Sequence, residues 1–266
     1  MPELPDVEVF KEYLDATSLH QKIEKVAVAG IDMLEGVSVN DLRAALERSA
    51  FHTTRRHGKY LFVQLDNDHW LVLHFGMTGF LKYFKNPEKE TAHERLLVRF
   101  YNGYHLAYDC QRKLGLIALS DDADDFIQQR ELGPDPLASE FGFDTFRAAL
   151  TSSKAAVKSV LMNQKRMAGI GNIYSDEILF QAGVHPKSRA ATLDDDQLQA
   201  LYREMMDTVL PTAIEARAQP QDFPSGFLIP HRKKGETCPR CGAKIRHAKV
   251  SGRSAYFCPE CQKKKG

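Results

Sequence analysis

The segment 238–261, CPRCGAKIRHAKVSGRSAYFCPEC, determines how the C-terminal part of this 266-residue chain is built. Cys238 and Cys241 form one C-x2-C pair, and sixteen residues separate it from the second pair, Cys258 and Cys261. Four thiolates at this spacing can bind one zinc ion tetrahedrally, which leaves no coordination position for an activated water. We therefore predict one structural Zn2+ ion. The alternative is that the four cysteines form two disulfides, and disulfides are typical of secreted chains.

Basic residues concentrate around this predicted metal site. Residues 231–266 contain eleven Lys or Arg and two Asp or Glu, a net charge of +9. The whole chain carries +1, so residues 1–230 carry −8. Ser251-Gly252 is a turn signal directly before Arg253, which predicts a metal-bound hairpin with a basic tip. Such a patch is typical of a surface that binds a polyanion, and a solvated charged tail is the alternative.

The N-terminal sequence MPELPDVE places a proline directly after Met1. If Met1 is removed, Pro2 carries a free secondary amine, which is partly neutral and nucleophilic near pH 7. Such an amine can attack an electrophilic sugar carbon and then carry an iminium cation, with Glu3 as the adjacent carboxylate. A proline followed by an acidic residue is also ordinary helix-start chemistry, which is the alternative.

The residues between the two ends change from a β pattern to a helical one. Residues 5–20 have helical spacing, and residues 23–119 contain strand-like runs, one short helix at 39–49 and the hairpin signal Asn102-Gly103. These patterns predict an α+β fold in which an N-terminal helix fronts a β-sandwich. After Gly133-Pro134 the spacing predicts helices over 144–151, 153–163, 173–182 and 194–216, with Thr192 as the cap of the last.

Gly169-Ile-Gly-Asn172 separates two of the predicted helices and starts the second. Two glycines before a helix start expose backbone amides, which commonly bind a phosphate. A plain turn between helices is the alternative.

No secretion signal or membrane span stands out in the sequence. The N-terminus lacks a charged-then-apolar leader, and the longest apolar stretches are too short to cross a bilayer. We therefore expect a cytoplasmic protein without a membrane partner. The fifth cysteine, Cys110, is expected to be a small buried residue.

Taken together, these segments resemble the formamidopyrimidine-DNA glycosylase / endonuclease VIII family of base-excision repair enzymes. The resemblance covers almost the whole chain in order: MPELPDVE, HGKYL at 57–61, HFGMTG at 74–79, QRKLG at 111–115, AGIGNIYSDEILFQAGVHP at 168–186, and the terminal CPRC…GRSAYFCPECQ. It implies three domains. These are the helix plus β-sandwich at 1–120, a helix–two-turn–helix DNA-binding domain at 121–232, and a zinc-finger hairpin at 233–266.

The resemblance also implies a mechanism for a bifunctional DNA glycosylase/AP lyase. Pro2 would be the nucleophile at C1′ of the damaged nucleotide, and Glu3 would assist sugar-ring opening and later proton transfers. Lys59 would contact the phosphates beside the lesion and help anchor the opened sugar. The Schiff base on Pro2 would then permit β- and δ-elimination without a catalytic metal.

Six further residues match family positions that contact double-stranded DNA. Three would contact phosphates, and three would fill the gap left by the extruded base: His74, Asn172 and Arg253 in the first group, and Met77, Arg112 and Leu114 in the second. A buried, hydrogen-bonded histidine is the alternative for His74. Ordinary core packing is the alternative for Met77 and Leu114.

The sequence departs from the family pattern in ways that bear on the substrate. Asp6 replaces the usual second glutamate, and Leu114 replaces a phenylalanine. The segment 218–237 is short where formamidopyrimidine-type members have a loop that caps 8-oxoguanine, and His231-Arg232-Lys233 replaces a tyrosine-glycine-arginine run. These differences argue against a preference for 8-oxoguanine and leave formamidopyrimidines or oxidised pyrimidines open. The resemblance as a whole implies an oxidised base of the formamidopyrimidine or 8-oxoguanine type as substrate. An oxidised-pyrimidine-preferring endonuclease VIII-like enzyme and a non-catalytic binder of damaged DNA are the alternatives.

These expectations extend to the working form of the protein. We expect a monomer that loses Met1, acts on duplexes carrying an oxidised base or abasic site, and is nucleoid-associated through DNA binding.

Overall fold

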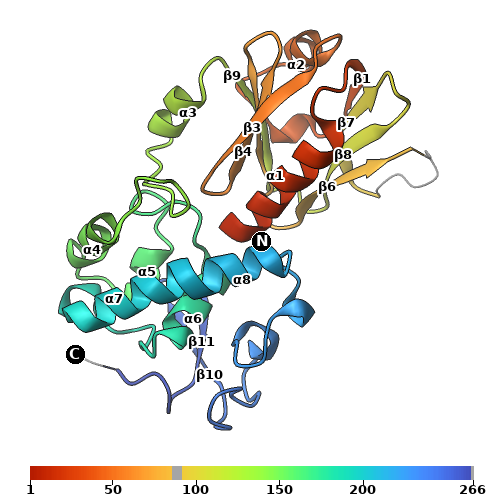
Figure 1. Ribbon diagram of the computed structural model, residues 1–266. Helices are drawn as coiled ribbons and strands as arrows, with labels where there is room; N and C mark the ends of the chain where they lie inside the picture. The colour runs from red at the N-terminus through yellow and green to blue at the C-terminus, as the bar shows by residue number, and fades with distance from the viewer. Residues whose placement is uncertain (86–91, 265–266) are drawn as a thin grey trace. The chain divides into compact units, whose positions relative to one another are not determined.

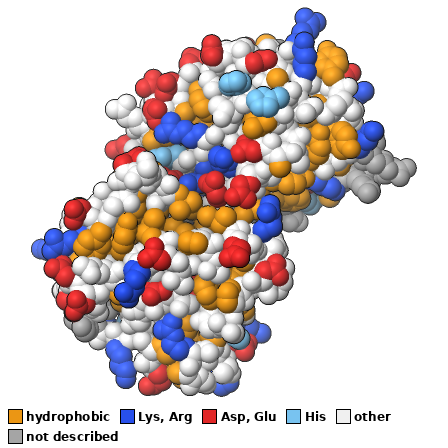
Figure 2. All heavy atoms as spheres, in the orientation of Figure 1, with side chains coloured by type: hydrophobic (Ala, Val, Ile, Leu, Met, Phe, Trp, Pro, Cys, Tyr) orange, Lys and Arg blue, Asp and Glu red, His pale blue; other side chains and the backbone are white. Residues whose placement is uncertain are grey.

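The structure is a computed structural model that describes residues 1–85 and 92–264 (Figure 1). Contacts divide it into two compact units, each described separately below. The first unit contains Met1–Pro2 and Val7–Glu131, and the second contains Glu3–Asp6 and the chain from Leu132 onward. Acidic and basic side chains are interspersed on the face shown in Figure 2.

The first unit combines helix α1 (Leu4–Ser18), most of which belongs to it, with two sheets (Figure 1). The strand orders are β1-β7-β8-β6 and β2-β9-β5-β4-β3. The strands are β1 Ile23–Val28, β2 Leu34–Glu35, β3 Phe51–His57, β4 Tyr60–Leu65, β5 Trp70–His74, β6 Gly79–Phe84, β7 Glu94–Phe100, β8 His105–Cys110 and β9 Leu116–Ser120.

The core of this unit lies between the two sheets. Buried aliphatic side chains of both sheets form one cluster, which Val7 and Leu14 of α1 complete. Helix α2 (Val39–Leu46) adds to the same cluster, and α3 (Ala123–Gln129) packs through Phe126 on the other face of the five-stranded sheet. The predicted helix-fronted β-sandwich is therefore confirmed.

The hairpin predicted at Asn102-Gly103 joins β7 to β8, which pair in antiparallel register. Gly103 has a φ of +83°, a conformation that glycine adopts without strain. Cys110, at the end of β8, is a free and fully buried thiol, as expected.

The second unit is helical around its own apolar core. Its helices are α4 Phe143–Thr151, α5 Val157–Leu161, α6 Asn172–Gln181, α7 Asp195–Arg203 and α8 Leu210–Glu215. Helix α5 is shorter than the predicted 153–163 segment, because backbone hydrogen bonds pair residues 155 and 157 with the loop 188–190.

The predicted long helix at 194–216 is interrupted. A π-helical turn, Glu204–Val209, separates α7 from α8. Pro211 follows this turn, has no N–H to donate, and its ring would clash with a carbonyl one turn earlier, which accounts for the widening. The helix cap is Asp194, whose side chain accepts from the backbone N–H of Gln197; the prediction of Thr192 as the cap was wrong. Asp194 forms a reciprocal capping box with Gln197, whereas the Thr192 hydroxyl bonds back to Arg189.

The C-terminal hairpin consists of β10 (Arg246–Val250) and β11 (Arg253–Phe257). Ser251 and Gly252 both have positive φ, as in the two-residue turns that match the twist of hairpin strands. Arg253 is therefore exposed at the tip of the hairpin, where the sequence predicted it. Over residues 1–85 and 92–264, no helix combines the length and apolarity needed to cross a membrane.

Candidate active site and nucleic-acid interface

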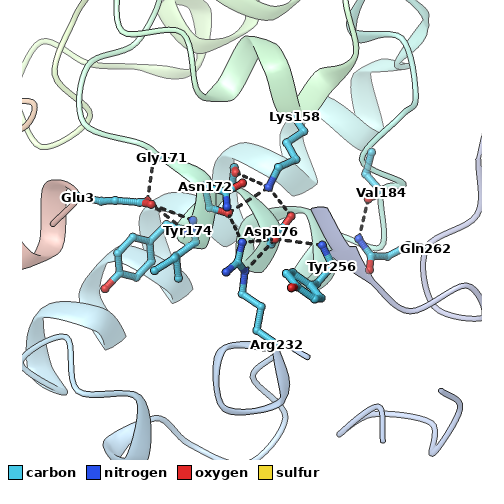
Figure 3. Close-up of polar contacts among 12 residues, drawn as sticks. Glu3, Lys158, Gly171, Asn172, Tyr174, Asp176, Val184, Arg232, Tyr256 and Gln262 are labelled. Carbon is cyan, nitrogen blue, oxygen red and sulfur yellow. Dashed lines mark hydrogen bonds and ion pairs between the residues drawn. The ribbon is translucent and has the colours of Figure 1, made fainter. Parts of the chain in front are cut away.

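Glu3 is completely buried, and its carboxylate lies at the start of helix α6 (Figure 3). One carboxylate oxygen, Oε2, accepts hydrogen bonds from the backbone N–H groups of Gly171 at 2.8 Å and Tyr174 at 3.2 Å. The other, Oε1, accepts from the N–H of Ile173 at 2.8 Å. These are amides that a helix start leaves unpaired, and the helix dipole favours an anion there.

The sequence raised a phosphate as the ligand of these glycine-flanked amides. In the structure, three of them bind the chain's own carboxylate at Glu3 instead. The anion-binding character predicted from Gly169-Ile-Gly-Asn172 is therefore present. Its occupant was not predictable, because Glu3 and Gly171 are 168 positions apart in the chain.

Gly169 explains why the N-terminus meets this turn so closely. Its φ is +102°, and a Cβ at this position would lie 2.7 Å from the Cβ of Leu4. The backbone N–H of Leu4 donates to the Gly169 carbonyl at 3.0 Å. A glycine is therefore needed at 169 for residues 3 and 4 to dock. Pro2, half-buried, directly precedes the residue held in this way.

Asp6 supports Glu3 from one turn further along the chain. Its Oδ2 accepts from the backbone N–H of Glu3 at 2.8 Å. Burial raises the pKa of Asp6 to about 7. Asp6 also lines a cavity of about 260 Å3 whose other walls include Tyr174, Phe223 and Arg232. A titratable carboxyl next to a cavity is a common feature of functional sites.

Lys59 and His74 belong to neighbouring parts of one sheet in the first unit. Lys59 is buried in the turn between β3 and β4, and His74 pairs with Tyr60 in the β4–β5 register. The Nδ1 of His74 accepts from the N–H of Gly76 at 3.3 Å, which leaves Nε2–H as the donor. Burial, with a smaller effect of the Lys59 charge, lowers the pKa of His74 to about 4. His74 is thus a neutral hydrogen-bond donor.

Met77, Arg112 and Leu114 come from two adjacent loops of the first unit, and all three are exposed. Gly76 has a φ of +57°, and a Cβ there would lie 2.4 Å from the Leu114 carbonyl carbon. The N–H of Arg112 donates to the Thr78 hydroxyl at 3.1 Å. These contacts hold the loops together. Because Met77 is 36% exposed and Leu114 is 53% exposed, core packing does not explain their apolar side chains.

Asn172 is the first residue of α6. Its side-chain Oδ1 is buried and has no hydrogen-bond partner among the described residues. Its backbone carbonyl accepts from Lys158 Nζ at 3.0 Å and from Arg232 Nη2 at 3.1 Å (Figure 3). Sequence reasoning missed Lys158 as well as Asp176, its buried ion-pair partner. The sequence signal that could have identified them is a charged residue in the middle of a mostly apolar helix, Lys158 in α5 and Asp176 in α6.

The four cysteine sulfurs fit one tetrahedral zinc ion. All four ligand atoms lie within 4.8 Å of one another. The Sγ–Sγ distances are 3.9 Å for Cys238 and Cys261 and 3.5 Å for Cys241 and Cys258. Zn–S bonds of about 2.3 Å in tetrahedral geometry place sulfurs about 3.8 Å apart. The predicted single zinc site is confirmed. Its ligand set is closed, so the metal serves structure.

Comparison with known families accounts for the chain in three consecutive segments. Residues 1–117 match the formamidopyrimidine-DNA glycosylase N-terminal domain, and residues 132–224 match the helix–two-turn–helix domain of the same enzymes. Residues 235–264 match a zinc finger found in formamidopyrimidine-DNA glycosylase and isoleucyl-tRNA synthetase.

Individual relatives agree over full length. The formamidopyrimidine-DNA glycosylase of Pelotomaculum thermopropionicum is 34% identical over 277 residues, which cover 100% of each chain. That of Heliobacterium modesticaldum is 35% identical, covering 99% of this chain and 100% of the relative. Among solved structures, a Lactococcus lactis glycosylase bound to abasic-site DNA has a TM-score of 0.87 and 29% identity over 98% of this chain and 100% of that one. With the domain matches and full-length identities agreeing, the chain belongs to the formamidopyrimidine-DNA glycosylase family.

Proposed function

We propose that this protein is a bifunctional DNA glycosylase and AP lyase that excises oxidised bases from double-stranded DNA in base-excision repair. The observation that carries the proposal is the Glu3 carboxylate, which three backbone amides hold in a buried position directly after Pro2. A buried, fixed carboxyl beside a secondary amine is suited to move protons around a nucleophile.

The proposed reaction begins after Met1 is removed. The Pro2 nitrogen forms a bond to C1′ of the damaged nucleotide, the C1′–base bond breaks, and the base leaves with its electron pair and takes up a proton. The proton that the Pro2 nitrogen carries after forming this bond passes to the Glu3 carboxylate, and Glu3 then delivers it to the ring oxygen. The C1′–ring oxygen bond breaks, so the sugar opens and the nitrogen becomes an iminium cation. This cation acidifies the C2′ proton. Its loss expels the 3′ phosphate by β-elimination, and δ-elimination expels the 5′ phosphate.

The remaining predicted site residues are proposed to hold the DNA during these steps. Lys59, a neutral His74, Asn172 and Arg253 would contact phosphates. Met77, Arg112 and Leu114 would enter the gap left by the extruded base, since extrusion costs a few kcal/mol of stacking and pairing. Exposed apolar side chains on loops that glycine contacts hold together are suited to this role.

We assign these roles to three domains, at 1–120, 121–232 and 233–266, that act in one monomer. We also propose that the protein works in the cytoplasm, associated with the nucleoid through its DNA affinity. A fluorescent fusion that remains diffuse after DNA damage would contradict the nucleoid association.

The lesion class is proposed to be formamidopyrimidine or 8-oxoguanine. A preference for oxidised pyrimidines is the second candidate, and the short segment 218–237 favours it. This segment is held close to α6, because the buried carboxylate of Glu177 accepts from the N–H groups of Leu228 at 3.0 Å and Ile229 at 2.7 Å. This segment therefore forms a fixed wall of the cavity of about 260 Å3 that Asp6 lines.

Borohydride trapping on a panel of duplexes tests both the chemistry and the lesion class. Reduction of the iminium should leave a covalent protein–DNA adduct, and peptide mapping should place it on the Pro2 nitrogen. The lesion trapped fastest identifies the substrate. An adduct on a lysine would refute the proline mechanism. Tight, salt-sensitive binding with no adduct on any lesion would identify a non-catalytic damage binder.

A further inference from the structure

A buried ion cluster lies behind the start of α6, on the opposite side of Asn172 from the Glu3 carboxylate (Figure 3). Its centre is Asp176, which is 1% exposed. Lys158 Nζ donates to Asp176 Oδ1 at 2.5 Å and also to the Ser175 hydroxyl at 3.1 Å. Burying a carboxylate is costly unless it is paired and hydrogen-bonded, so the partners of Asp176 are strongly constrained in position.

Arg232 is the second cation of this cluster, and it comes from the segment that departs from the family pattern. Its Nε donates to Asp176 Oδ2 at 2.8 Å, while its Nη2 donates to the Asn172 carbonyl at 3.1 Å. The guanidinium also lies over the Tyr256 ring, 4.9 Å from its centre. A planar, multidentate cation can make all three contacts at once, which a lysine amine cannot.

The same carboxylate also binds the zinc hairpin. The backbone N–H of Tyr256 donates to Asp176 Oδ2 at 3.1 Å. Tyr256 lies in β11, the strand that begins with Arg253 at the hairpin tip. The Ser251 hydroxyl at the same tip lies 2.7 Å from the Ser159 hydroxyl of α5. Asp176 and Arg232 thus connect the residue that starts α6 to the strand that carries Arg253.

We propose that Arg232 is a positioning residue that locks the zinc hairpin onto the turn carrying Asn172, so that Asn172 and Arg253 bind DNA as one preorganised unit. The inference rests on the proposed function, in which these two residues contact phosphates. Arg232 itself has its Nε and Nη2 groups committed to Asp176 and Asn172. Arg232 therefore affects DNA affinity indirectly, by fixing the positions of Asn172 and Arg253.

A double-mutant cycle with salt titration tests this role on the full-length, zinc-loaded protein. The probe is a duplex that carries a tetrahydrofuran abasic-site analogue. Arg253→Ala should weaken binding about tenfold and reduce the slope of log affinity against log salt by about 0.9, because one phosphate contact is lost. Arg232→Met should weaken binding by a similar factor and should also lower the slope, because Arg253 then contacts its phosphate only in part. In the Arg232→Met background, Arg253→Ala should cost only about twofold to threefold.

Lys234→Met is the matched control, since it removes an exposed cation two residues later. Its effect should add to that of Arg253→Ala. The inference is overturned if Arg253→Ala still lowers the salt slope by about 0.9 in the Arg232→Met background, which would show that the Arg253 phosphate contact does not depend on Arg232. It is also overturned if the effects of Arg232→Met and Arg253→Ala are additive.

Two readouts separate this inference from other failures. The zinc content of Arg232→Met shows whether this variant keeps a folded hairpin. If the hairpin is lost, Arg232→Lys replaces it, because lysine keeps the charge but not the planar guanidinium. The same two criteria, salt slope and additivity, then apply to Arg232→Lys. Wild-type protein that neither binds the probe duplex nor forms a borohydride adduct refutes the proposed function itself. Wild-type binding with an additive cycle refutes the role of Arg232 alone.

Discussion

Glu3 and Leu114 illustrate two ways in which this protein presents a functional side chain. Glu3 is 0% exposed and its carboxylate accepts three backbone hydrogen bonds, whereas Leu114 is 53% exposed on a loop. A group that transfers protons must be held in place before the substrate arrives. A group that replaces a base needs only to be available when the base leaves. The first role is coupled to folding, and the second is independent of it.

The largest effect is expected from Glu3→Gln. Glutamine offers one acceptor oxygen to three N–H groups, so both stability and activity should fall. We expect a loss of at least about 2 kcal/mol in the free energy of unfolding, measured by urea titration. Single-turnover excision should fall by about 10²–10⁴. Glu12→Gln, an exposed carboxylate of the same helix, is the control and should change neither. An unchanged stability for Glu3→Gln would remove the contrast with Leu114.

The next largest effect is expected at Leu114, the exposed residue in the comparison with Glu3. Leu114→Ala should change the free energy of unfolding by no more than about 0.5 kcal/mol. Excision from a fully paired duplex should fall about tenfold, because the side chain no longer compensates for lost stacking. Strand cleavage at a pre-formed abasic site should change much less. A loss of more than about 1 kcal/mol in stability would show that Leu114 is a packing residue.

A smaller effect should appear in the pH dependence of stability. Burial raises the pKa of Asp6 to about 7, so the protonated form is favoured in the folded protein. The stability that this proton provides is present below about pH 4 and is lost as pH rises through about 7. Asp6→Asn should therefore show a smaller fall in Tm between pH 5 and pH 8 than wild type.

The fall should not vanish in Asp6→Asn, because burial also raises the pKa of Glu177 to about 7. Asparagine keeps an oxygen that can accept from the Glu3 N–H, so the variant should fold normally. Parallel curves for the variant and wild type would show that Asp6 is ionised throughout this range.

The smallest expected effect concerns His74, whose ring should not titrate near neutral pH. Because burial lowers the pKa of His74 to about 4, its ring should stay neutral from pH 8 to pH 5. The His74 Hε1 resonance in NMR spectra should therefore hold its chemical shift over this range. A titration near pH 6.5, the ordinary histidine value, would place His74 among the exposed, weakly constrained residues.

Much of the fold was predictable because local patterns and chemistry fixed it. The strand-like pattern over 23–119 became the strands of the two sheets, the Asn102-Gly103 signal became the β7–β8 turn, and the two C-x2-C pairs form the metal site. The long helix at 194–216 was predictable in place but not in form. Helical periodicity does not show how the backbone accommodates Pro211. The surrounding packing decides that a π-helical turn forms before it.

The buried charges could not be predicted. Lys158, Asp176 and Glu177 occupy helical positions where sequence alone favours solvent. They are tolerated because their partners come from distant segments: Arg232 and Tyr256 for Asp176, and Leu228 and Ile229 for Glu177. Such compensation depends on geometry that no local pattern encodes.

The sequence by itself determined the zinc ligands, the order of the elements and the chemistry available at Pro2 and Glu3, because metal spacing, periodicity and functional groups are properties of the residues. The tertiary structure alone decided that the amides before α6 bind Glu3, that His74 is neutral, and that Arg232 connects Asn172 to the zinc hairpin. The physical reason is that burial and hydrogen bonding set the state of a charged group, and both depend on contacts between residues far apart in the chain.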